Sequence, residues 1–385
     1  KPELLPLRRQ TMSESIILST VFYIFCGAAF LQISYLLFIH LRLARYREKD
    51  AGTQELPPVS IIICARNEDT NLKNNLPKIL AQDYPNFEVI VVDDNSEDGT
   101  TEYLFFLAQK EPRLKRTSTK NSNRMMAGKK FPLTLGLKAA AYETVLLTDA
   151  DCYPATNQWL KQMMRAYAPG KEIVLGYGAY AKQDGSLNRR IRYETVHSAI
   201  NYLSFALAGI PYMGVGRNLS YKKHLFFQSN GFFDHRDIPS GDDDLFINKV
   251  ARRRNTGIMI NPDAFTISEP KETWEDWREQ KTRHLSTARF YRFRHKIWLG
   301  LQPISHILFW FSSIAVVAML HPWWYVVAGA WLLRIVLQRY IYGTSMRKLG
   351  EPDLVKYIEW YDFLQLFYYF RFAKAALVKS KYRWD

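Results

Sequence analysis

Strand-like segments that end in polar residues constrain the fold of this chain more than any other feature. Residues 59–65 (VSIIICA), 87–92 (FEVIVV) and 143–148 (ETVLLT) are short and rich in apolar or β-branched side chains. Segments with helical spacing follow the first two, at 71–82 and 101–110. Because strands that alternate with helices form βαβ units, the pattern predicts an α/β domain with a largely parallel sheet.

Polar side chains follow each of these strands directly. In an open α/β sheet, ligands bind beyond the carboxyl ends of the strands. We therefore expect a shared polar edge, and its members are Arg66–Asn67–Glu68, Asp93–Asp94 and Asp149–Asp151. Two interpretations stay open for the last pair, an ordinary solvated strand end or the ligands of a cation. Lys129 and Lys130 could likewise contact phosphate or lie on a solvated loop.

Three consecutive acids open a predicted helix in SGDDDLF, residues 240–246. One carboxylate is enough to cap a helix N-terminus. Three neighbouring carboxylates repel one another and raise the pKa of at least one of them, which suits a general base. One of these three carboxylates is therefore a candidate general base.

Apolar segments flank this α/β part. The 24 residues at 16–39 contain no charged side chain, and such a run crosses a bilayer core of roughly 30 Å. The segments 299–320 and 323–342 are predicted to be two more spanning helices joined by a tight turn. The expected parts are an N-terminal segment with its transmembrane helix (1–49), an α/β domain (50–298), two transmembrane helices (299–343) and an amphipathic or membrane-dipping segment (344–385).

The basic residues predict how the chain lies in a membrane. Lys and Arg follow the spans, so the positive-inside rule predicts a multi-pass protein of the cell (inner) membrane with its α/β domain in the cytoplasm. The net charge of +15 could instead indicate nucleic acid, but no nucleic-acid module is found. Residues 281–296 hold six Lys or Arg and no acid, which favours contact with anionic membrane lipids and no nucleic-acid partner. No protein partner is indicated.

Taken in order, four motifs resemble glycosyltransferase family 2, which has the GT-A fold. They are VSIIICARNE, VVDDNSEDGT, TDADCYP, and GDDD with QKTRH 38 residues after Asp242. The flanking apolar segments resemble the membrane-embedded branch with the cellulose and hyaluronan synthases and ceramide glucosyltransferase. The resemblance implies a Rossmann-like, mixed and mostly parallel sheet.

The resemblance also implies roles for the polar residues. Arg66, Glu68 and Asp94 would line the nucleoside pocket. Asp149 and Asp151 would hold Mg²⁺ or Mn²⁺ on the donor diphosphate, and an ion shared with phosphates needs only one or two protein carboxylates.

The later motifs would act on the diphosphate and the acceptor. A gapless alignment makes Asp242 the base, and a shift of one residue makes it Asp243. Gln280 and Arg283 match the Q-x-x-R pattern, whose Arg would meet the diphosphate. His284 replaces the usual Trp, and we expect it on the acceptor side together with Trp277.

The resemblance implies a metal-dependent, inverting hexosyltransferase that uses a nucleotide-sugar donor, expected to be a UDP-sugar. The departure at His284 and the small number of C-terminal spans favour a lipid or lipid-linked acceptor at the cytoplasmic membrane face. A processive polysaccharide synthase is the close alternative. A catalytically silent, glycosyltransferase-like scaffold is the alternative from another class.

Overall fold

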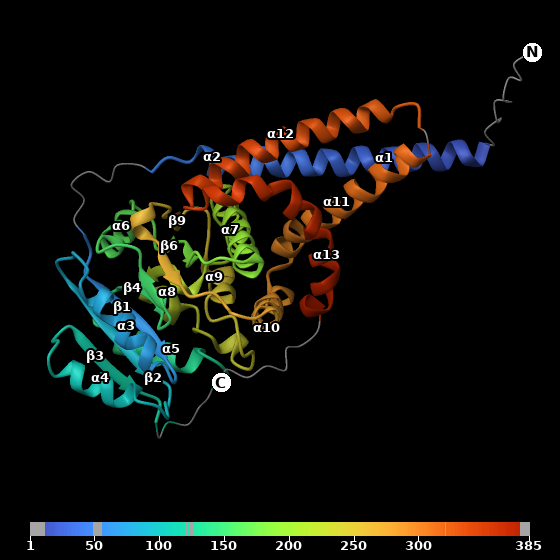
Figure 1. Cartoon of the computed structure of the whole chain (residues 1–385). Coiled ribbons are helices and arrows are strands. Elements are labelled where there is room, and N and C mark those ends of the chain that lie inside the picture. The colour runs from blue at the N-terminus through green and yellow to red at the C-terminus, as the bar shows by residue number, and fades with distance from the viewer. Residues whose placement is uncertain (1–11, 49–55, 121, 123–125, 320, 378–385) are drawn as a thin grey trace, which may run out of the picture.

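The computed structural model describes residues 12–48, 56–120, 122, 126–319 and 321–377. Figure 1 shows an α/β part built around a sheet, and long helices that extend from it on one side. The first helix of the chain packs against helices near its C-terminal end. The two ends of the sequence therefore build the helical part together.

The main sheet has seven strands in the order β3-β2-β1-β4-β8-β6-β9. Strands β1 to β4 are parallel, whereas β8 is antiparallel to β4 and β6. The sheet is thus mixed, and its first half is parallel as the sequence predicts. The strands are Val59–Ala65 (β1), Phe87–Asp93 (β2), Leu114–Ser118 (β3), Thr144–Asp149 (β4), Ile173–Leu175 (β6), Leu219–Lys222 (β8) and Thr256–Ile258 (β9).

The register brings the ends of the three central strands level. Ala65 at the end of β1 lies beside Asp93 at the end of β2. On the other side of β1, Cys64 lies beside Asp149 at the end of β4. Every residue of β1 and β2 is buried, as in parallel strands covered on both faces. The predicted common edge of these strands is confirmed.

Helices cover both faces of the sheet. Ile61 belongs to the core under α3, and Ile62 belongs to the core under α5. A side chain at Gly136 in α5 would lie 2.6 Å from Ile62, so glycine permits the close contact of helix and sheet. The helices of this part are Asp69–Leu80 (α3), Thr100–Ala108 (α4), Lys130–Ala139 (α5), Trp159–Arg165 (α6), Ser186–Leu207 (α7), Lys223–Gln228 (α8), Asp244–Val250 (α9) and Trp274–Leu285 (α10).

A second sheet of three short strands follows β4 in the order β5-β10-β7. Strand β10 (Thr266–Ser268) pairs antiparallel with β5 (Cys152–Pro154) and parallel with β7 (Gly178–Tyr180). Because β5 begins three residues after β4 ends, the connecting turn lies between the two sheets. This turn contains Asp151.

The long helices form a layer beside the α/β part. In Figure 1, α1, α11 and α12 extend away from the sheets, and α13 returns toward α10. The elements of this part are Met12–Ser34 (α1), Tyr35–His40 (η1, a π-helix), Leu41–Arg45 (α2), Phe293–Ala318 (α11), Trp324–Lys348 (α12), Pro352–Tyr357 (η6) and Ile358–Leu377 (α13).

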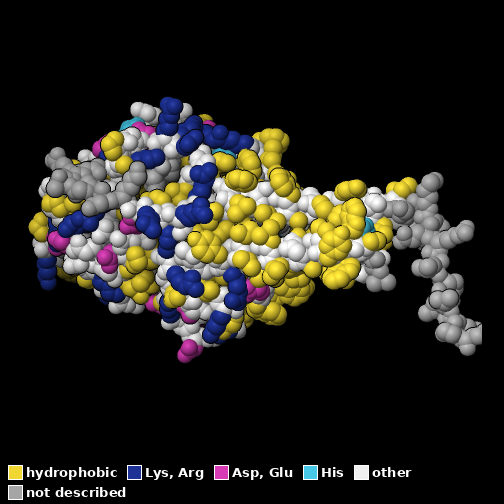
Figure 2. All heavy atoms as spheres, turned by 90° about the horizontal axis from the view of Figure 1, so that it is seen from above, with side chains coloured by type: hydrophobic (Ala, Val, Ile, Leu, Met, Phe, Trp, Pro, Cys, Tyr) yellow, Lys and Arg dark blue, Asp and Glu magenta, His cyan; other side chains and the backbone are white. Residues whose placement is uncertain are grey.

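Two helical segments of the described chain are long and apolar enough to cross a membrane, judged by length and composition alone. They are Ile16–Arg45 and Phe293–Ala318, in the regions of the predicted spans 16–39 and 299–320. Helix α12 does not meet the same criteria, so its composition does not support the third predicted span at 323–342. Figure 2 shows hydrophobic side chains covering much of the protruding helices.

Helix α12 differs from a uniformly apolar helix because it buries a charged side chain. Arg334 is 4% exposed and donates hydrogen bonds of 3.0 and 2.8 Å to the two carboxylate oxygens of Asp362 in α13. Gln338 donates to the same carboxylate at 2.9 Å. A guanidinium inside a helix layer is tolerated only when a paired and hydrogen-bonded carboxylate compensates it. The predicted C-terminal segment 344–385 therefore contains Asp362, the carboxylate that compensates the buried charge of α12.

Candidate functional site

Two loops at the carboxyl edge of the sheet are joined by hydrogen bonds. The backbone N–H groups of Asn67 and Glu68, after β1, donate to the hydroxyls of Ser96 and Thr100, after β2, at 3.0 and 2.9 Å. Asn67 has a positive φ of 55°, a conformation that asparagine tolerates better than most residues. The RNE and DDNSEDGT motifs, residues 66–68 and 93–100, are therefore held together as one side of the site, called the wall below.

The predicted nucleoside residues lie on this wall. Asp94 is buried and accepts a 2.7 Å hydrogen bond from Thr119. The Glu68 carboxylate accepts one from Asn71 at 2.6 Å. Burial, and then the negative charges of Asp151 and Asp149, raise the pKa of Glu68, so the wall faces these acids. Arg66 is half-buried at the same edge.

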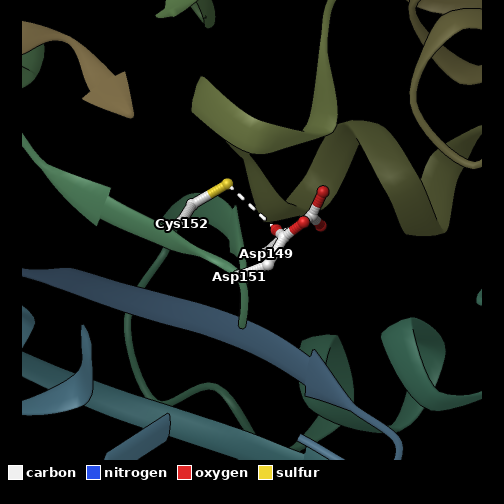
Figure 3. A group of neighbouring side chains, drawn as sticks. All are labelled: Asp149, Asp151 and Cys152. Atoms are coloured by element: carbon white, nitrogen blue, oxygen red, sulfur yellow. Dashed lines mark hydrogen bonds between the residues drawn. The ribbon is translucent and has the colours of Figure 1, made fainter. Parts of the chain in front are cut away.

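Asp149 and Asp151 lie side by side at the end of β4. Potential ligand atoms of Asp149, Asp151 and Cys152 all lie within 4.8 Å of one another. Figure 3 shows the two carboxylates together, with the Cys152 sulfur directed toward them. The Cys152 thiol donates to Asp151 at 3.3 Å and shares a 2.9 Å hydrogen bond with Ser268. Burial, Asp151 and Asp149 raise the pKa of this thiol well above its usual range, and its soft sulfur is not the ligand type that Mg²⁺ or Mn²⁺ prefers.

The remaining donor set fits a hard divalent cation. Two carboxylates suit Mg²⁺ or Mn²⁺, which prefer oxygen ligands and share the rest of their coordination with phosphate oxygens and water. Asp151 is exposed and Asp149 is half-buried. The pair is therefore accessible to a ligand from solvent.

Positive charges surround the two acids. Burial alone would raise the pKa of Asp149, but the ion pair with Lys129 lowers it below the usual value. The charges of Arg217 and Arg283 act in the same direction. For Asp151 the surrounding protein and the Asp149 carboxylate raise the pKa. The site thus combines acidic ligands with cations that can accept an anionic group.

Arg217 is a site residue that the sequence did not reveal. Its guanidinium donates to Ser268 and to the Gly178 carbonyl, each at 3.1 Å. It also lies 4.4 Å from the centre of the Tyr180 ring. Nothing in the surrounding GVGRN sequence marks Arg217, because the residues that it contacts in the second sheet are far from it along the chain.

Lys129 and Lys130 are not on a solvated loop. Lys129 pairs with Asp149, and the Lys130 ammonium is buried, donating to the Ile238 and Ser240 carbonyls at 2.6 Å each. The preceding Gly128 has a φ of 64°, and a side chain there would lie 1.9 Å from the Pro239 carbonyl oxygen. The two segments are therefore tightly joined. Lys130 fixes the loop that leads into the acidic segment.

The three acids of that segment have different surroundings. Asp243 caps α9 and accepts 2.7 Å hydrogen bonds from the N–H groups of Asp244 and Gly216. Asp244 accepts from Leu245, Thr287 and Tyr291. Among the described residues, the half-buried Asp242 carboxylate has no hydrogen-bond partner. Burial, Asp242 and Asp244 raise the pKa of Asp243 to about 8.

Helix α10 presents the third group of predicted residues. Gln280 accepts a 3.4 Å hydrogen bond from Tyr180, and Arg283 is close enough for its charge to act on Asp149. His284 is exposed near the end of this helix. The expectation for Trp277 needs correction, since it is 5% exposed and packs in the core formed with Ile191 and Phe372. Trp277 anchors α10 and does not present a surface to an acceptor.

Comparisons with known proteins agree with this arrangement. Residues 60–234 match the family described as Glycosyl transferase family 2. A probable glycosyltransferase of Bacillus subtilis, YdaM, is 28% identical over 253 residues, covering 63% of this chain and 57% of that protein. A poly-β-1,6-N-acetyl-D-glucosamine synthase of Staphylococcus aureus is 26% identical over 111 residues, 29% of this chain and 26% of that protein. The chain thus spans little more than half of the first relative and about a quarter of the second.

A solved structure resembles nearly the whole chain. It is the mannosyltransferase PcManGT from Pyrobaculum calidifontis, in complex with GDP-Man and Mn²⁺. The TM-score is 0.56 at 19% identity, over 91% of this chain and 99% of that one. At this identity the likeness concerns the fold, which is GT-A-like. The matched domain and the relatives support a glycosyltransferase.

Proposed function

We propose that this glycosyltransferase family 2 domain transfers a sugar from a nucleotide-sugar to a lipid or lipid-linked acceptor, with inversion and with a bound Mg²⁺ or Mn²⁺. The observation that supports this most directly is the Asp149–Asp151 pair, which faces the cations Lys129, Arg217 and Arg283. A nucleoside diphosphate needs both a metal site and positive charge. The mannosyltransferase of similar fold was solved with a nucleotide-sugar and Mn²⁺.

The residues divide between the two sides of the breaking bond. Asp149 and Asp151 would hold the cation, whose chemistry is to neutralise charge on the departing diphosphate. Arg283, with Gln280 beside it, would bind the same phosphates, while Arg66, Glu68 and Asp94 would line the nucleoside pocket. Asp242 would accept the proton of the acceptor hydroxyl. Asp243 is the second candidate for the base.

The lipid side of the proposal rests on the surface of the helical part. Many large apolar side chains are exposed on α11, among them Phe293, Ile297 and Trp298 at its start. They lie within or directly after the basic stretch 281–296, and basic residues beside an apolar surface attract anionic lipid. We place the protein at the cytoplasmic face of the cell membrane. A processive polysaccharide synthase would differ in releasing a ladder of long products, and a silent scaffold in releasing none.

Purified full chain in detergent should be stabilised by one nucleoside diphosphate only when Mn²⁺ or Mg²⁺ is present. A ligand at 100 times its dissociation constant stabilises the folded state by about 2.7 kcal/mol. Thermal unfolding with UDP, GDP, ADP and CDP, each with and without metal, measures this directly. We expect UDP to give the largest shift. Folded protein that responds to none of them would refute the nucleotide-sugar donor.

Replacing Asp151 by alanine should remove the metal-dependent part of this stabilisation, because one of two carboxylate ligands is lost. The nucleotide alone should bind as weakly as it binds to the wild type without metal. Asp184→Ala is the matched control, since Asp184 is an exposed acid outside the site. A full metal-dependent shift in Asp151→Ala would show that the cation is held elsewhere.

A further inference from the structure

A buried carboxylate joins three helices next to the proposed diphosphate site. Glu194 of α7 is 5% exposed. Its Oε1 lies 3.1 Å from the Nζ of Lys281 in α10, and it also accepts a hydrogen bond from the Tyr368 hydroxyl of α13. Beside this cluster, Ile191 of α7 packs with Trp277 and Phe372 of the same two neighbouring helices.

The cluster lies within the functional segment of α10. Lys281 follows Gln280 directly and precedes Arg283 by two residues. Helix α10 packs chiefly against α13, and none of the strands makes an extensive contact with it. The sheet that carries Asp149 therefore does not by itself fix where α10 lies. The contacts of α10 with α7 and α13, together with the hydrogen bond from Tyr180 of β7, do so.

We propose that Glu194 is a positioning residue that holds α10 so that Arg283 faces Asp149 and the donor diphosphate. This inference rests on the proposed function, since the consequence appears at the diphosphate. Hydrogen bonds to an ionised group are stronger than those between neutral groups, and burial shields this one from water. Small displacements of a group that contacts the reacting centre cost large factors in rate. Glu194 contacts no substrate and acts through Lys281.

Glutamine is the substitution that best keeps the shape of Glu194. Its second oxygen, Oε2, is buried and has no hydrogen-bond partner among the described residues. Glutamine at this position can place its amide nitrogen there and still accept from Tyr368 with its oxygen. Glu194→Gln therefore removes the charge that holds Lys281 and changes little in shape.

The test compares the affinity of UDP with that of UMP, both with Mn²⁺, in wild-type full chain and in variants. Because Arg283 is proposed to meet the diphosphate, Glu194→Gln should weaken UDP by about tenfold, or 1.4 kcal/mol, and change UMP much less. In an Arg283→Ala background, Glu194→Gln should have almost no further effect on UDP. A purely structural role would weaken both nucleotides alike, and its effect would add to that of Arg283→Ala.

Glu88→Gln is the matched control. Glu88 is also 5% exposed and pairs with a lysine, Lys115, at 2.5 Å, but it lies in β2, on an element that does not pack against α10. This variant should keep the wild-type ratio of UDP to UMP affinity even if its melting temperature falls. Should Glu194→Gln not fold, Lys281→Met removes the same pair from the other side and must show the same selective loss of UDP.

The outcomes separate the two proposals. If wild-type protein binds neither nucleotide with metal, the proposed function is refuted and the role of Glu194 falls with it. If wild-type protein binds UDP and both variants keep its ratio of UDP to UMP affinity, only the positioning role of Glu194 is overturned. Additive effects of Glu194→Gln and Arg283→Ala would overturn it as well.

Discussion

Replacing Asp242 by asparagine should abolish sugar transfer and leave nucleotide binding intact. Among the three acids of the segment, its carboxylate alone has no hydrogen-bond partner among the described residues, so it is free to accept a proton. General base catalysis contributes a factor of about 10²–10⁴, and we expect kcat to fall by this much. The measurement is initial transfer rate with a lipid acceptor, together with the metal-dependent thermal shift with the nucleotide.

Asp243→Asn is the comparison that decides between the two candidates for the base. Asparagine can still accept one of the hydrogen bonds that Asp243 receives from Gly216 and Asp244, so we expect α9 to remain folded. If Asp243 were the base, its pKa of about 8 would make the wild-type rate rise as the pH increases through 8, because the base acts only when deprotonated. Full transfer activity in Asp242→Asn, with such a pH profile, would move the role to Asp243.

Replacing Glu351 by glutamine should destabilise the whole protein by about 1.5–3 kcal/mol, the contribution of hydrogen bonds to a charged group, since Arg192 then keeps only its partly exposed partner Asp353. Glu351 follows α12 and pairs with Arg192 of α7, and their side chains are 2% and 5% exposed. The pair joins the helical layer to the α/β part. Thermal and urea unfolding in detergent would measure the loss.

Asp353→Asn is the matched control for this prediction. Asp353 binds the same guanidinium at 2.7 Å, but its side chain is 47% exposed. Exposed ion pairs contribute about 0–1 kcal/mol because water screens them. Equal losses in the two variants would mean that burial does not determine the strength of this pair.

The sequence predicted the parts of the fold that depend on local pattern. The strands at 59–65 and 87–92 follow from apolar runs that stop at polar residues. Because these strands pair in parallel, their carboxyl ends then lie level with each other. The same pattern brought Asp149 and Asp151 to the edge that Glu68 faces. These residues could be found because each one lies at the end of a strand or within three residues of it.

Residues that reach the site from elsewhere could not be predicted in this way. Arg217 depends on how the small sheet lies beside β8, and Lys130 on the contact between the loops at 128 and 239. Trp277 illustrates the opposite error, since it was expected on the acceptor side, yet α13 covers it. The composition of α12 does not support the third predicted span, and the charge that interrupts it, Arg334, is compensated by a residue far along the chain.

The pairing of Arg334 with Asp362 has a consequence for how the protein is made. The two residues are 28 positions apart, so α12 is complete on the ribosome before its counter-ion has been synthesised. Until then the guanidinium must remain in water or at a lipid surface, because burial without a partner is costly. Gln32 of α1 also accepts from Arg334, but only the Asp362 carboxylate neutralises its charge, so we expect α12 to pack fully against α1 and α11 once α13 is present. The two helices should enter the structure as one late unit during biogenesis.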